Sequence, residues 1–110
     1  MDTYYDPRDL QQFAQIGQDA PELAGKFFDY YQAVFAEGEL SAREKSLIAL
    51  AVAHAVQCPY CIEAYTKGSL EQGCSRGEMT EAVHVACAIR GGASLVHGMQ
   101  MRRHAEKVSL

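Results

Sequence analysis

The sequence predicts an all-α protein of about six helices, folded as a single domain over residues 1–110. Apolar side chains recur at helical spacing in nearly every segment, and helix-start signals precede most of these segments. No period-two alternation bounded by turn residues is present, so no strand is expected. A chain of 110 residues that is 48% hydrophobic and 22% charged has room for one core only.

The first helices are expected to start at prolines. Asp6 is a candidate N-cap ahead of Pro7, and Gly17 can end that helix. The next helix is expected from Pro21 to Gly38, with apolar and aromatic residues along one broad stripe. We interpret two aromatic pairs on it as core and interface residues, not as a substrate site: Phe27 with Phe28 and Tyr30 with Tyr31.

Two capping boxes of the S-x-x-E type mark the next helix starts, at Ser41 and at Ser75. The helix after Ser41 is apolar nearly all round over residues 47–56, which predicts that it is buried on most sides. Between the two boxes, a further helix is expected from Cys58-Pro59 to about residue 72, with Gly73 as its terminator.

The C-terminal segment is expected to be helical on both sides of Gly91-Gly92. These glycines either interrupt the helix or let a neighbouring helix pack closely against it, and residues 93–108 form a last amphipathic helix. Helices this apolar in a short chain would leave hydrophobic faces exposed on a monomer, so a homo-oligomer is expected.

Charge and hydropathy exclude several classes of function. A net charge of -4 gives no basic field for nucleic acid, and no apolar run approaches the ~20 residues that span a membrane. The acidic, polar N-terminus is not a secretory signal, which favours a cytoplasmic protein. Thiols are kept reduced in that compartment, so the four cysteines are expected to be reactive, metal-bound or buried.

The segment AVQCPYCIEAYTKG carries the most informative motif, Cys58-Pro59-Tyr60-Cys61. Structural zinc is disfavoured because Cys74 and Cys87 do not form a second C-x-x-C pair, and a c-type haem is excluded because Ile62 replaces the required histidine. We expect neither a metal nor another cofactor. A redox dithiol fits better, since Pro59 places Cys58 at the N-cap of a helix, where backbone N–H groups and the helix dipole stabilise a thiolate.

The segments around this dithiol resemble a known family. REKSLIALAVAHAVQCPYCIEAYTKGSLEQG and EAVHVACAIRGGASLVHG, within about residues 40–100, are similar to the AhpD-like alkylhydroperoxidase group of the carboxymuconolactone decarboxylase superfamily. The opening DTYYDP and AREKSLIALAVAHAVQCPYC look more narrowly like the peroxidase-like proteins associated with arsenosugar biosynthesis. The resemblance implies an all-helical protomer, trimers or hexamers, and a thiol peroxidase in which Cys61 attacks the peroxide and Cys58 resolves the product. Helix-dipole reasoning alone favours Cys58 as the lower-pKa thiol.

The proton relay of the AhpD pattern is missing from this chain. Its glutamate position is Ser46 and its histidine position is Tyr65, and neither side chain is a good general base at neutral pH. His54, one helical turn before Cys58, is the leading substitute, while Tyr60 and Tyr65 can donate hydrogen bonds to a peroxide oxygen. Glu44 is expected to serve its capping box instead.

Other chemistry-bearing residues are expected to be structural. His84 and His97 are expected to bond carbonyls in the core or at a subunit contact. Cys87 is expected to be a small buried residue, and Cys74, beside a glycine, to be more exposed.

The leading hypothesis is therefore a thiol-dependent peroxidase with the candidate catalytic residues Cys61, Cys58, His54 and Tyr65. It would take a hydroperoxide substrate and a dithiol reductant protein as partners. An alternative is a non-catalytic dithiol module that binds a thiophilic species such as trivalent arsenic, or that senses redox state. Lactone decarboxylation ranks third, because the dithiol has no part in it and no carboxylate-binding arginine cluster is apparent.

Overall fold

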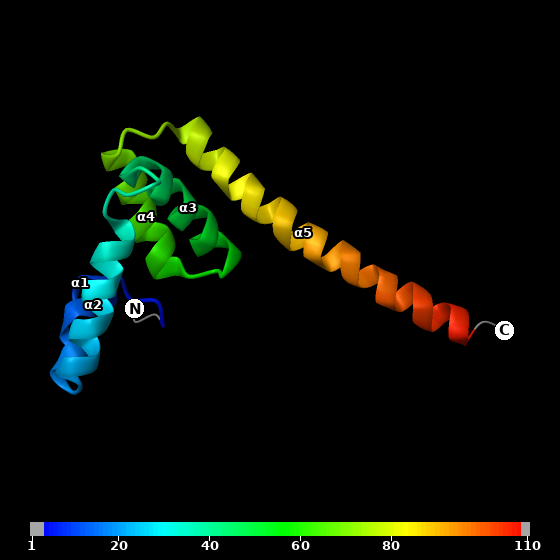
Figure 1. Cartoon of the computed structure of the whole chain (residues 1–110), viewed down its shortest axis with the longest axis horizontal. Coiled ribbons are helices and arrows are strands. Elements are labelled where there is room, and N and C mark those ends of the chain that lie inside the picture. The colour runs from blue at the N-terminus through cyan, green and yellow to red at the C-terminus, as the bar shows by residue number, and fades with distance from the viewer. Residues whose placement is uncertain (1–3, 109–110) are drawn as a thin grey trace.

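The computed structural model describes residues 4–108, and this part of the chain is all-α, as predicted (Figure 1). It contains six helices and no strand. In chain order these are α1 (Pro7–Gln11), the 3₁₀ helix η1 (Phe13–Gln18), α2 (Pro21–Phe35), α3 (Ala42–Ala55), α4 (Pro59–Glu71) and α5 (Arg76–Lys107). None of the helices within residues 4–108 combines the length and the hydropathy needed to cross a membrane.

The predicted N-caps are confirmed at four helix starts. The Asp6 carboxylate accepts a hydrogen bond from the backbone N–H of Arg8, and the Cys58 sulfur accepts one from the backbone N–H of Cys61. Ser41 and Ser75 each form both hydrogen bonds of a capping box. These contacts are local to the chain, which is why the sequence predicts them well.

Two glycine predictions need correction. Gly17 does not end a helix, because it lies inside η1, and the first segment divides earlier, at Gln12. Gly91 and Gly92 do not interrupt α5, which runs unbroken for 32 residues. A Cβ atom built on either glycine meets nothing within 4 Å, so no helix of the same protomer packs closely there.

The core is small and lies where α3, α4 and the start of α5 meet. Leu50, Cys74 and Met79 are buried in it, with Leu47 and Tyr65 packed against them. The prediction that α3 is buried on most sides is wrong for the single chain. The reason is that α4 and α5 cover only part of its surface, so other apolar residues of α3, such as Val52, stay half exposed.

Polar contacts join the helix starts at this core. Arg43, in the first turn of α3, donates from Nη2 to both carboxylate oxygens of Glu78 at 2.5 Å. Glu78 also completes the capping box of α5 by accepting from the backbone N–H of Ser75 at 2.8 Å. One carboxylate therefore caps α5 and fixes it against α3.

The folded chain is elongated because α5 extends far beyond the other helices (Figure 1). Its radius of gyration is 19.0 Å. A compact domain of this length has a radius of gyration of about 13 Å. The distal part of α5 exposes apolar side chains such as Leu95 (80% exposed) and Val96 (65% exposed).

Candidate functional site

The dithiol lies at the sharp turn from α3 into α4. Gln57 adopts a positive φ of 57°, and the backbone N–H of Cys58 then bonds back to the carbonyl of Ala53 at 3.0 Å. Cys58 is the N-cap of α4, Pro59 is its first residue, and the N–H of Cys61 donates to the Cys58 sulfur at 3.3 Å. The turn and the cap together hold both cysteines in the first turn of α4.

The pKa values of the two thiols are shifted in opposite directions. The pKa of Cys58 is lowered, chiefly by a hydrogen bond from the Cys61 side chain and further by the backbone N–H groups of Cys61 and Tyr60, against the opposing effect of burial. The pKa of Cys61 is raised to about 11, first by burial and then by the hydrogen bond and the charge of Cys58. Between the two ionisations the pair carries one negative charge, held mainly on Cys58.

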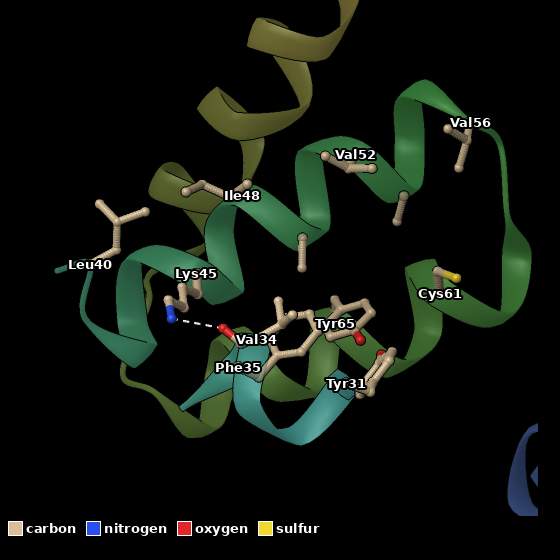
Figure 2. Close-up of a pocket in the computed structure, with 12 residues that line it drawn as sticks. Tyr31, Val34, Phe35, Leu40, Lys45, Ile48, Val52, Val56, Cys61 and Tyr65 are labelled. Carbon is tan, nitrogen blue, oxygen red and sulfur yellow. Dashed lines mark hydrogen bonds between the residues drawn. The ribbon is translucent and has the colours of Figure 1, made fainter. Parts of the chain in front are cut away.

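Two apolar hollows meet at this pair. The first, which we call the long groove, lies between α2, α3 and α4, has a volume of about 440 Å³ and contains Cys61 without Cys58 (Figure 2). The second, the N-terminal hollow, is lined by the N-terminal helices, α2 and α4, has a volume of about 340 Å³ and contains both cysteines. Tyr31, Cys61 and Tyr65 line both of them.

Tyr65 lies where the sequence places it, one helical turn beyond Cys61. Its ring stacks on Phe35 with centroids 5.3 Å apart and an interplanar angle of 18°. Because Tyr65 lines both hollows beside Cys61, the structure brings these two predicted site residues together.

The side chains of His54 and Ser46 line neither of the two hollows at the dithiol. His54 Nδ1 donates to the carbonyl of Leu50 at 2.9 Å, and the ring lines two hollows against α5 that contain neither Cys58 nor Cys61. Ser46 is buried, donates to the carbonyl of Arg43 at 2.7 Å and lines neither of the dithiol hollows. Within the protomer, the proposed substitute base and the family's glutamate position thus both lie outside the site.

Two tyrosines complete the surroundings of the dithiol. The hydroxyl of Tyr60 lies 3.0 Å from the carboxylate of Asp9 and donates to it, so α1 engages this side chain. Tyr31 was interpreted from the sequence as a core or interface residue, yet it lines both dithiol hollows, and its pKa is raised by burial and by the charge of Cys61. Nothing in the local sequence of α2 indicates this role, since the helical spacing of Tyr31 to Phe35 predicts only a shared stripe.

The remaining cysteines differ from prediction. Cys74 is buried (4% exposed), because it lies in the core with its sulfur 3.8 Å from the Ser46 hydroxyl. Cys87 is exposed, although the neighbouring Ala86 is buried and Arg90 of α5 still donates to the carbonyl of Ala55. His84 and His97 are also exposed on α5, and do not lie in the core of the protomer.

The residues at the dithiol offer thiol and tyrosine chemistry. Among residues 4–108, no group of three or more His, Cys, Asp or Glu side chains gathers to hold a metal ion. The arrangement provides one thiol with a lowered pKa, a second thiol close to it and two adjoining apolar hollows.

Comparisons with known proteins agree with this fold. Residues 21–101 match the model of the carboxymuconolactone decarboxylase family. A protein of Paracoccus denitrificans described as "Uncharacterized protein 4 in cox locus" is 45% identical over 91 residues, covering 83% of this chain and 82% of that protein.

Two solved structures are also similar. The crystal structure of a Methanobacterium thermoautotrophicum protein has a TM-score of 0.74 at 37% identity and covers 76% of this chain and 94% of its own. The apo structure of a carboxymuconolactone decarboxylase family protein from Legionella pneumophila has a TM-score of 0.67 at 32% identity, covering 91% and 89%. The chain therefore belongs to the carboxymuconolactone decarboxylase family, within the AhpD-like superfamily.

Proposed function

We propose that the protein is a thiol-dependent peroxidase that reduces a hydroperoxide through Cys58 and Cys61. The observation that carries the proposal is the dithiol itself: Cys58, the N-cap of α4, accepts a hydrogen bond from the backbone N–H of Cys61 and has a lowered pKa, and Cys61 lines two apolar hollows. A low-pKa thiolate beside a second thiol is the arrangement that thiol redox chemistry requires.

The proposed chemistry balances in three steps. The Cys61 sulfur attacks the distal peroxide oxygen, the O–O bond breaks, and the products are a Cys61 sulfenic acid and an alkoxide that leaves as the alcohol. The Cys58 thiolate then attacks the Cys61 sulfur, forming the disulfide and releasing hydroxide, which is protonated to water. A dithiol reductant protein supplies two electrons and two protons by thiol–disulfide exchange and is itself oxidised to a disulfide.

Cys58 takes over the proton relay in this proposal. Its thiolate accepts the proton of the Cys61 thiol along their hydrogen bond as Cys61 attacks, and then delivers that proton to the alkoxide. This role needs no base at Ser46 or His54, and the lowered pKa of Cys58 makes it the better proton donor to the alkoxide. In this proposal Tyr65, which lines both hollows, donates a hydrogen bond to a peroxide oxygen.

Stoichiometric oxidation of the reduced protein tests the proposal. Addition of tert-butyl hydroperoxide is expected to give a Cys58–Cys61 disulfide, identified by peptide mass mapping. Cys58→Ser is expected to stop at a sulfenic acid on Cys61 that dimedone traps, and Cys61→Ser is expected to yield little trapped product. A fast sulfenic acid on Cys58 would reverse the order of the cysteines, and no disulfide in the wild type would end the proposal.

The reduced protein also serves to test the alternative function, a non-catalytic dithiol binding module. Titration of the reduced dithiol with arsenite and with zinc would show tight stoichiometric binding, without peroxide turnover, if the pair were a binding module.

We also propose a homo-oligomer, a trimer or hexamer, because the distal part of α5 exposes large apolar side chains. Light scattering of the purified protein at several concentrations tests that state.

A further inference from the structure

The long groove has different chemistry at its two ends. Lys45 lies toward one end and Cys61 toward the other, with apolar side chains such as Ile48 and Val52 between them (Figure 2). The groove residues of α3 run from Lys45 to Val56, a distance of about 16 Å along the helix axis. A molecule that fills the groove is therefore long and apolar, with room for a polar group at the lysine end.

Lys45 is held at its end of the groove by the last turn of α2. Its Nζ donates to the carbonyl of Val34 at 2.7 Å and to the carbonyl of Ala36 at 2.6 Å. An ammonium group has three donors, so one is left for another acceptor. Among residues 4–108 Lys45 forms no ion pair, and its positive charge is not neutralised by a carboxylate of the chain.

The N-terminal hollow is suited to a different molecule. It contains the carboxylate of Asp9, which repels an anion, and it exposes both Cys58 and Cys61. An anionic substrate is therefore favoured in the long groove, whereas thiol–disulfide exchange with a reductant needs only the N-terminal hollow.

We propose that the long groove binds the hydroperoxide of a fatty acid. The carboxylate accepts a hydrogen bond from Lys45, the acyl chain lies along α3, and a mid-chain hydroperoxide group reaches Cys61. The inference rests on the proposed peroxidase function, and it adds the substrate class. Charge complementarity at Lys45 is what selects a carboxylate over an uncharged hydroperoxide.

Rates of disulfide formation with matched substrates test this inference. The probes are linoleic acid hydroperoxide and its methyl ester, each below its micelle concentration, with tert-butyl hydroperoxide as the reference. The wild type is expected to react roughly tenfold faster with the free acid than with the ester, the effect of about one charge-assisted hydrogen bond. Lys45→Met is expected to bring this ratio near one, and Lys45→Arg to restore it. Lys67→Met, on the exposed face of α4, is the matched control and is expected to keep the wild-type ratio.

Failure of the inference is distinguishable from failure of the peroxidase function. If tert-butyl hydroperoxide oxidises the dithiol but the acid and the ester react equally, the substrate class is wrong and the peroxidase stands. If no peroxide oxidises the dithiol, the proposed peroxidase function is wrong. A binding measurement then tests whether the long groove accepts a fatty acid. The hydroxy acid that corresponds to the reduced product should then still displace a fluorescent fatty acid from the wild type, and do so about tenfold more weakly from Lys45→Met. Equal binding by both proteins overturns the inference.

Discussion

Removal of Cys58 is expected to raise the thiolate fraction of Cys61 and thus its alkylation rate, although it also removes the base proposed for the peroxide reaction. The pKa of Cys61 is raised from 9.0 to about 11. A rise of this size leaves ~100-fold less Cys61 thiolate at neutral pH. Burial is the first cause and remains in Cys58→Ala, whereas the hydrogen bond and the charge of Cys58 are lost. The gain in Cys61 thiolate is therefore expected to be roughly tenfold, with ~100-fold as its ceiling.

Alkylation measures this gain directly. Reduced protein is treated with iodoacetamide at neutral pH, and the rate at Cys61 is followed by peptide mass mapping in a Cys87→Ser background, which removes the exposed thiol. Cys58→Ser keeps a hydroxyl but loses the negative charge, so its rate at Cys61 should also exceed that of the wild type. An unchanged or slower rate at Cys61 in Cys58→Ala would refute the reasoning that Cys58 keeps Cys61 protonated.

Three further predictions concern the scaffold. Leu50→Ala should lower the free energy of unfolding in urea by ~3 kcal/mol, because Leu50 is 2% exposed in the core; a loss below ~1 kcal/mol would contradict the packing described. The pKa of Glu78 is lowered to about 2, chiefly by its hydrogen bond to Arg43. The stabilisation of the folded protein by this ion pair is therefore present above pH 4.5, the ordinary pKa, and is lost as the pH falls toward 2. The melting-temperature difference between wild type and Glu78→Gln should shrink over that range, and a constant difference would argue against the ion pair. Cys74 should react with a disulfide reagent only after unfolding, and labelling of Cys74 in the native protein would count against its burial.

The sequence predicted the local features of the fold best. Asp6, Ser41, Cys58 and Ser75 cap their helices through contacts within the next few residues, so the signal and the structure lie in the same short segment. The dithiol at the start of α4 was predicted for the same reason. The proximity of Tyr65 to Cys61 also followed from helical spacing.

Features set by contacts between helices were predicted poorly. Cys74 was expected to be exposed beside Gly73, yet the packing of three helices buries it, while Cys87 in an apolar helix is exposed. Tyr31 comes to the dithiol only because α2 packs beside α4, and nothing local to α2 indicates that neighbour. His54 was placed near Cys58 by helical spacing, but the turn at Gln57 separates the two helices.

The meeting of two hollows at Cys61 has a kinetic consequence. On the proposed chemistry, the alcohol product can remain in the long groove while the reductant approaches the disulfide through the N-terminal hollow. Product and reductant then bind at the same time, so added alcohol should lower the maximal rate without competing with the reductant. A single shared opening would instead make them compete. Steady-state inhibition patterns therefore report whether the two hollows act as separate entrances.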